Sequence, residues 1–166
     1  LQEGEGFFAA YAPGNSHVIY PDGYAKPMPP GARLLFQLHY TPNGTATEDQ
    51  TRLGLIFAKR PPLRLVRTIG IPNFRIQIPP GVENHVESAR LPVLFDATIL
   101  SFMPHMHVRG KAFRYELVQR SGQRRTLLEV PRYDFNWQLG YRLADPLPVS
   151  RGDLVEVTAW YDNSSK

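Results

Sequence analysis

The sequence predicts an all-β protein built as an antiparallel β-sandwich. Short runs of residues alternate between apolar and polar side chains, which is the pattern of strands with one buried face. Sixteen prolines and thirteen glycines are scattered between these runs, where they punctuate turns. No segment sustains a helical period for three turns, and strand follows turn at the spacing of a sandwich.

The first sixty residues predict few strands. The aromatic run 6–12 is a short candidate, and the Pro-, Gly- and Asn-rich stretch 13–30 is typical of a loop. Residues 33–40 are the clearest strand of this half, and 51–58 is expected to return beside it after the Asn43-Gly44 turn. The side chains of the first strand alternate between Leu34, Phe36, Leu38 and Tyr40 on one face and Leu35, Gln37 and His39 on the other.

A domain boundary is expected at Lys59-Arg60-Pro61-Pro62, because prolines stop strand pairing and suit a connector. It divides the chain into residues 1–60 and 61–166. The strands predicted beyond it are 63–70, 74–78, 84–91, 94–103, 113–120, 126–130, 136–143 and 154–161. The half-buried alternation is clearest at Phe113, Tyr115 and Leu117 against Arg114 and Glu116, and at Val155, Val157, Ala159 and Tyr161 against Glu156 and Thr158.

Composition excludes several classes of protein. The net charge of +4 is spread among acidic residues, and no basic patch with a nucleic-acid-binding motif appears. The chain has no cysteine, which excludes disulfides, thiol catalysis and cysteine-ligated zinc. Because no basic patch appears, we expect no nucleic-acid partner. No apolar run approaches the length of a membrane-spanning helix, so we also expect no membrane span.

The strongest candidate for chemistry is a pair of histidines one residue apart, His105 and His107, at the end of the predicted strand 94–103. In an extended chain, side chains two residues apart point to the same face, so both imidazoles can close on one metal ion. Met103 lies on that face, whereas Met106 points the other way. Imidazole suits copper, zinc, iron and nickel, and a neighbouring thioether tilts the choice towards copper.

Other polar and aromatic residues have less specific patterns. His17 and His85 lie in polar, loop-like contexts and are expected to be surface histidines. No spacing pairs the aspartates for acid–base catalysis; these are Asp96, Asp134 and Asp153. A cluster of aromatic residues could line a substrate cleft or pack into the core; its members are Tyr133, Phe135 and Trp137.

Two motifs in this order resemble the copper type II, ascorbate-dependent monooxygenases, the family of peptidylglycine α-hydroxylating and dopamine β-monooxygenases. The first is Phe36-Gln37-Leu38-His39-Tyr40, and the second is His105-Met106-His107-x-x-Gly110-Lys111. The text from Met103 to Lys111, together with Tyr133-Asp134-Phe135-Asn136-Trp137, looks most like the bacterial branch. The resemblance covers most of the chain.

The resemblance implies two jelly-roll-like sandwich domains with one copper on each. His39 matches one of three histidines of the first, electron-storing copper, and Gln37 is a candidate to support it. His105 and His107 match the two histidines of the second copper, where dioxygen and substrate meet. Ascorbate is the implied reductant, and the implied reaction hydroxylates a C–H bond of a small organic substrate. An extracytoplasmic, periplasmic or secreted location is expected.

The chain also departs from the family pattern. The family's other two histidines of the first site lie upstream, and the methionine ligand of the second lies downstream of the strand matching 154–161. We therefore expect a fragment of a longer polypeptide that is inactive by itself: residues 1–60 would end the first domain, and 61–166 would be most of the second. Met103 is the candidate substitute ligand. It stands where peptide-amidating members have an arginine for the peptide carboxylate. A methionine cannot make that charged, two-pronged contact, so a peptide with a C-terminal glycine is not the expected substrate.

Two alternatives of other classes remain open. One is a non-catalytic β-sandwich for binding or adhesion that retains a vestigial metal site. The other is a histidine-based zinc hydrolase, which would need a third hard ligand or a carboxylate base beside His105 and His107. No such residue is evident in the sequence.

Overall fold

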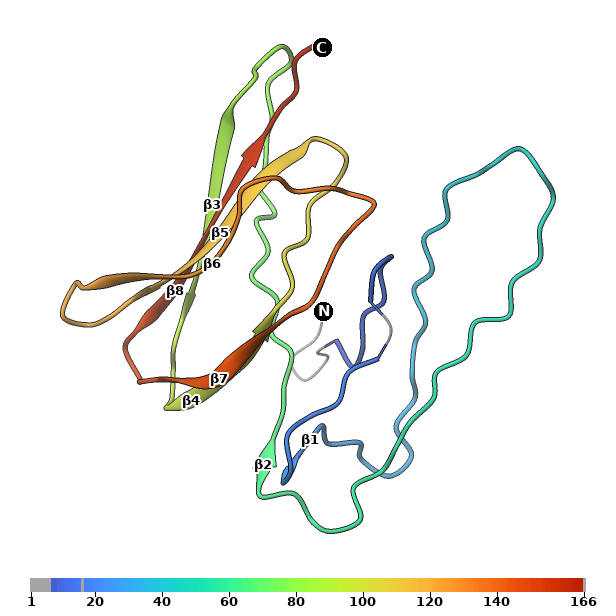
Figure 1. Ribbon diagram of the computed structural model, residues 1–166, viewed down its shortest axis with the longest axis vertical. Coiled ribbons are helices and arrows are strands. Elements are labelled where there is room, and N and C mark those ends of the chain that lie inside the picture. The colour runs from blue at the N-terminus through green and yellow to red at the C-terminus, as the bar shows by residue number, and fades with distance from the viewer. Residues whose placement is uncertain (1–6, 16, 166) are drawn as a thin grey trace. The chain divides into compact units, whose positions relative to one another are not determined.

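The computed structural model describes residues 7–15 and 17–165 of the chain. Within these residues it contains strands and no helix, which confirms the predicted all-β fold class (Figure 1). No described segment is therefore a helix of the length and apolarity that a membrane crossing requires. The strands are β1 (Tyr24–Ala25), β2 (Arg64–Leu65), β3 (His85–Pro92), β4 (Ala97–Phe102), β5 (Gly110–Val118), β6 (Arg124–Val130), β7 (Tyr141–Val149) and β8 (Leu154–Tyr161).

The described residues divide into two compact units. The first consists of residues 7–9 and 18–69, and the second of residues 10–15, 17 and 70–165. The main division falls between Ile69 and Gly70, so the Pro61-Pro62 connector belongs to the first unit. His39 lies in the first unit, and the His105–His107 pair lies in the second.

The first unit contains little regular structure. Its described strands are β1 and β2, two residues each, which pair in parallel through Tyr24 with Arg64 and Ala25 with Leu65. The predictions of strands at 33–40 and 51–58 are wrong, because every residue of both segments is exposed and none belongs to a ladder. Alternation assigns side chains to faces, but a strand also needs a neighbour for its N–H and C=O groups. The described residues provide none here.

The second unit is a two-layered β-sandwich. One layer is the antiparallel sheet β3-β8-β5-β6, and the other is the antiparallel pair β4-β7. Phe102 of β4 meets Tyr115 of β5 with ring centroids 4.5 Å apart, so the core joins the two layers. The buried core residues are Phe102, Met106, Phe113, Tyr115, Leu117, Val149, Val155, Val157, Ala159 and Tyr161.

The predicted alternation in the central strands is confirmed. Along β5 the apolar positions 113, 115 and 117 are buried, whereas the intervening Arg114 and Glu116 lie on the other face. Along β8, Val155, Val157 and Ala159 are buried in the same core. The two strands pair in register, with Tyr115 opposite Val157. Apolar side chains therefore form one continuous inner surface, as expected for a sheet with one wet face.

Some observed strand boundaries differ from the predicted ones where turns or prolines interrupt the pattern. Residues 74–78 form no strand, and β7 begins at Tyr141 instead of Asn136, because residues before it form a turn. β7 contains Pro146 and Pro148, which cannot donate to a ladder. It tolerates them because it is an edge strand that pairs with β4 alone.

The segment between β4 and β5 carries the histidine pair. β4 belongs to the two-stranded layer and β5 to the four-stranded layer, so residues 103–109 cross from one layer to the other (Figure 1). Gly110 begins β5 opposite Tyr161 at the end of β8. The sandwich thus presents this crossing at the end of two paired strands.

Candidate metal centre

The two histidines lie side by side on the exposed side of the crossing. His105 and His107 are exposed, and their ring centroids are 5.4 Å apart with the ring planes nearly perpendicular. Met106, between them, is only 2 % exposed and belongs to the core. The prediction that the histidines share a face and Met106 takes the other is therefore confirmed. One core side chain anchors a short segment that holds two imidazoles in solvent.

Tyr133 fixes the backbone between the two histidines. Its hydroxyl accepts a hydrogen bond from the Met106 N–H at 2.9 Å and donates one to the Met106 carbonyl at 2.7 Å. Burial raises the pKa of Tyr133, which keeps the phenol neutral and able to do both. A single side chain therefore satisfies both backbone polar groups of Met106, the residue at the centre of His-x-His.

Close packing around Gly110 supports the same segment. A Cβ at this position would lie 2.8 Å from Met106 Cβ and 2.9 Å from Tyr133 Cδ1. Real Cβ atoms do not approach other carbons so closely, so a glycine is required where β5 begins. The Gly110 N–H also bonds the His107 carbonyl at 2.8 Å, which closes the turn after the second histidine.

Gln138 is the direct polar partner of His105. Gln138 Oε1 lies 2.6 Å from His105 Nδ1, and the Gln138 side-chain amide N–H donates to the Phe135 carbonyl at 2.9 Å. Gln138 itself is buried, whereas the imidazole it meets is exposed. The other ring nitrogen, Nε2 of His105, has no hydrogen-bond partner among the described residues, and neither ring nitrogen of His107 has one.

The spacing of the two rings is compatible with one shared metal ion. Imidazole nitrogens bind metals at about 2 Å, so two rings on one ion have centroids about 5 Å apart. The observed 5.4 Å agrees with that spacing. Neutral imidazoles are good ligands for copper and zinc. The donor set is therefore compatible with a copper ion held by His105 and His107.

The other predicted metal-site residues differ in their exposure and position in the chain. In the part of the chain that the structure describes, no three His, Asp or Glu side chains form a group that could hold a metal. Met103 is half-buried directly after β4, two residues before His105. His39 and Gln37 are exposed on the unpaired segment of the first unit. Within the second unit, the described residues bring His105 and His107 together.

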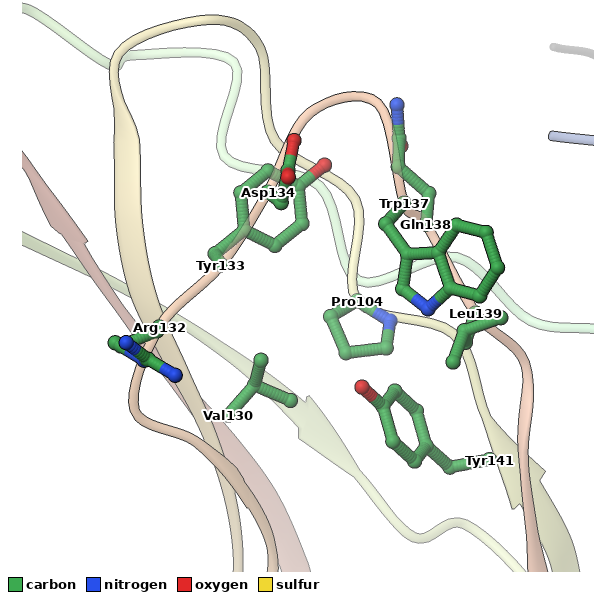
Figure 2. Close-up of a pocket in the computed structure, with 9 residues that line it drawn as sticks. All are labelled: Pro104, Val130, Arg132, Tyr133, Asp134, Trp137, Gln138, Leu139 and Tyr141. Carbon is green, nitrogen blue, oxygen red and sulfur yellow. The ribbon is translucent and has the colours of Figure 1, made fainter. Parts of the chain in front are cut away.

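A small hollow lies next to the pair. Pro104, which directly precedes His105, forms its wall together with Gln138, and Figure 2 shows Tyr133, Trp137 and Tyr141 around that proline. The hollow measures about 50 Å³, which is room for a few water molecules. Trp137 is 58 % exposed, so this aromatic cluster is not purely core. The full lining is Pro104, Val130, Arg132, Tyr133, Asp134, Trp137, Gln138, Leu139 and Tyr141.

The three aspartates cap turns. Asp153 accepts hydrogen bonds from the N–H groups of Arg120 and Ser150, at 3.2 and 2.9 Å. Asp96 accepts one from the Arg151 N–H, and Asp134 accepts one from Asn136, both at 2.8 Å. These bonds give each carboxylate a structural role of the kind that short polar side chains have in turns. His85 also departs from the loop expectation: it begins β3, and its Nε2 lies 2.8 Å from Glu87 Oε1.

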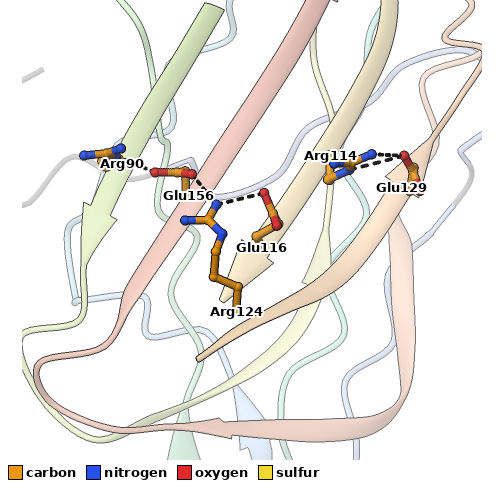
Figure 3. A network of polar contacts seen from close by, with 6 residues as sticks. All are labelled: Arg90, Arg114, Glu116, Arg124, Glu129 and Glu156. Atoms are coloured by element: carbon orange, nitrogen blue, oxygen red, sulfur yellow. Dashed lines mark hydrogen bonds and ion pairs between the residues drawn. The ribbon is translucent and has the colours of Figure 1, made fainter. Parts of the chain in front are cut away.

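A network of ion pairs covers the outer face of the four-stranded sheet (Figure 3). Glu116 of β5 and Glu156 of β8 lie directly opposite each other, an unfavourable pairing of like charges. Arg124 of β6 bonds both carboxylates, and Arg90 of β3 pairs with Glu156. The bond from Arg124 is the main cause that lowers the pKa of Glu156. Each described charge in the network has a partner on a neighbouring strand. We therefore interpret the network as a structural feature that joins the strands of this sheet.

The sequence did not predict that Tyr133 would hold the Met106 backbone, an arrangement that we call the clamp. It did not single out Gln138 at all. Tyr133 was singled out only as a cleft or core aromatic, and Gln138 follows it in a polar and aromatic turn with no metal-site pattern. They lie 27 and 33 residues beyond their partners Met106 and His105. Only the packing of that turn against the β4–β5 crossing brings them to the histidines.

A scan against protein-family models finds no match for this chain, and a search of the curated proteins finds no significant match. The case for a metal centre therefore rests on the paired imidazoles, their 5.4 Å spacing and the residues that hold them.

Proposed function

We propose that His105 and His107 are ligands of the catalytic copper of an ascorbate-dependent monooxygenase of which this chain is a part. The observation that carries the proposal is the pair of exposed imidazoles, 5.4 Å apart, on a backbone that Tyr133 holds. The two sequence motifs that resemble the copper monooxygenases add to it. Under this proposal His39, supported by Gln37, belongs to the first, electron-storing copper site.

The residues of the chain would act by pre-positioning. The buried Met106 and the Tyr133 hydroxyl hold the His-x-His backbone before a metal binds. Gln138 occupies Nδ1 of His105 and leaves Nε2 for a ligand bond. Copper, when bound, would supply the one-electron redox chemistry that activation of dioxygen requires.

Copper is favoured over hydrolytic zinc by the donor set. A zinc hydrolase needs a general base and usually a third protein ligand. Asp96, Asp134 and Asp153 accept hydrogen bonds in turns, and among the described residues no carboxylate joins the histidines. A pair of imidazoles with open positions suits an ion that must meet dioxygen and a small organic substrate.

The test is copper affinity, measured for Cu(I) by competition with a chromophoric chelator and for Cu(II) by calorimetry. We expect His105→Ala and His107→Ala each to weaken binding by about 100-fold, the upper end of losses seen for outer residues of metal sites. His85→Ala, a histidine paired with Glu87, is the matched control and should bind as the unaltered chain does. Equal copper affinity in the unaltered chain and all three variants would contradict the proposal.

Oxygen uptake separates a redox site from a binding-only domain. The longer polypeptide of which this chain is proposed to be a part, loaded with copper and given ascorbate, should consume dioxygen faster than its His105→Ala and His107→Ala variants with the same amount of copper. Free copper also oxidises ascorbate, so the variants set the background. Tight copper binding with uptake no faster than that background would favour the vestigial site of a binding or adhesion domain.

A further inference from the structure

We infer that Gln138 is a positioning residue that sets the tautomer of His105, so that the proton sits on Nδ1 and Nε2 is free to bind a ligand. The tautomer is a property of the metal-free chain. Its use for copper binding rests on the proposed function.

The hydrogen-bond chain admits one assignment of donors and acceptors. The Phe135 carbonyl can only accept, so the Gln138 side-chain nitrogen must face it, at 2.9 Å. The Gln138 side-chain oxygen then faces His105, and an amide oxygen can also only accept. His105 Nδ1, at 2.6 Å, must therefore carry the proton. In the neutral ring this leaves the lone pair on Nε2.

The surroundings hold Gln138 in that orientation. Its side chain is buried, with 7 % of the residue exposed. Its backbone carbonyl accepts a hydrogen bond from the Asn15 side-chain amide, whose oxygen accepts the Gly140 N–H at 2.8 Å. Asn15 thus ties down both sides of the turn that carries Gln138. A partner fixed before the metal arrives orients the imidazole at no further entropic cost.

The experiment is a long-range ¹⁵N–¹H correlation spectrum of the metal-free chain at about pH 8, where an ordinary histidine is neutral. In the unaltered chain we expect the His105 signals of an Nδ1–H imidazole. In Gln138→Met, which keeps the length of the side chain but has no oxygen, both tautomers should appear. Gln138→Glu keeps an acceptor and should retain the Nδ1–H form. Gln123→Met, on the exposed β5–β6 turn, is the matched control.

Copper affinity is the second readout. Loss of an outer partner of a histidine ligand costs about 10- to 100-fold in affinity, so Gln138→Met should fall in that range and Gln138→Glu should recover part of the loss. Amide spectra of each variant establish that it is folded. The tautomer of His105 in the unaltered chain tests the assignment even where Gln138→Met does not fold. An Nε2–H signal from His105 in the unaltered chain, or an unchanged tautomer in Gln138→Met, would overturn the inference.

The two readouts fail separately. A tautomer that shifts in Gln138→Met in a chain that binds no copper would leave the positioning role intact and refute the proposed copper site. Copper binding that persists in Gln138→Met with no shift of the tautomer would refute the positioning role and leave the proposed copper site intact.

Discussion

At the scale of the residue, the candidate site depends on side chains that would not bind the metal themselves but hold the histidines in place. Tyr133 has one hydroxyl, yet it both donates to and accepts from the backbone of Met106, the residue between the histidines. Removing a side-chain partner from a partly buried backbone group leaves that group without a hydrogen bond, which costs more than the bond itself contributed. The clamp should therefore be visible in both stability and metal affinity.

We expect Tyr133→Phe to lower the free energy of unfolding by about 1–3 kcal/mol, because two hydrogen bonds of about 0.5–1.5 kcal/mol each are lost. Copper affinity should fall as well, since the segment between His105 and His107 loses its support. Urea denaturation and the chelator competition measure the two effects. Tyr141→Phe is the control: it lies in the same hollow, and its hydroxyl bonds none of the described residues. Equal stability of the two variants would show that the clamp is unimportant.

At the scale of the element, the outer face of the four-stranded sheet combines strands through charge. Two glutamates oppose each other across β5 and β8, and an arginine from β6 bonds both. The Glu156 side chain is only 10 % exposed, so its ion pairs with Arg124 and Arg90 are screened less than pairs in open solvent. The strands β3, β8, β5 and β6 are thus coupled to one titrating carboxylate.

This coupling predicts that stability falls on acidification. The pKa of Glu156 is lowered in the folded chain, first by the Arg124 hydrogen bond, from an ordinary value of about 4.5. Its contribution is therefore complete above that value and is lost as pH falls through the lower, folded value, because the unfolded chain binds the proton more readily. Denaturation curves should show the gap between the unaltered chain and Glu156→Gln closing as pH drops below about 5.

A glutamate on the same sheet provides the comparison. Glu129 pairs with Arg114 across β5 and β6 but is about half exposed, at 49 % of its side chain. Exposed pairs contribute little because water and salt screen them. The free energy of unfolding of Glu129→Gln should therefore change with pH nearly as that of the unaltered chain does over the same range. A gap for Glu156→Gln that stays constant with pH would contradict the assignment.

At the scale of the whole molecule, the two units differ in how their apolar residues are used. The second unit buries aromatic and aliphatic side chains between two layers. In the first, large apolar side chains are exposed, with Leu35 at 97 % and Ile56 at 100 %. The unpaired segments there have neither a ladder nor a core to oppose local opening.

Limited proteolysis should reveal this difference. Trypsin should cut first after exposed basic residues of the first unit, Arg33, Arg52 and Lys59, because unpaired backbone enters a protease site readily. A fragment that contains β3 to β8 should persist longer. Mass spectrometry of the early products measures the order of cleavage. First cuts inside the strands of the second unit would contradict the picture.

The sequence alone determined the all-β class, the positions of most strands in the second unit and the shared face of the histidines. These features depend on the two-residue period of an extended chain, which is a local property. Phe113, Tyr115 and Leu117, or His105 and His107, take the same side wherever the strand lies. That is why the alternation in β5 and β8 could be read correctly.

The tertiary structure alone decided which segments find partners. Residues 33–40 have as clear an alternation as β5, yet they remain unpaired, because alternation specifies faces and not a neighbouring strand. Tyr133 and Gln138 reach the histidines from 27 and 33 residues away, through single hydrogen bonds that leave no periodic trace in the sequence. Which side chains could line the candidate centre was a local matter, but what holds them there depends on long-range packing.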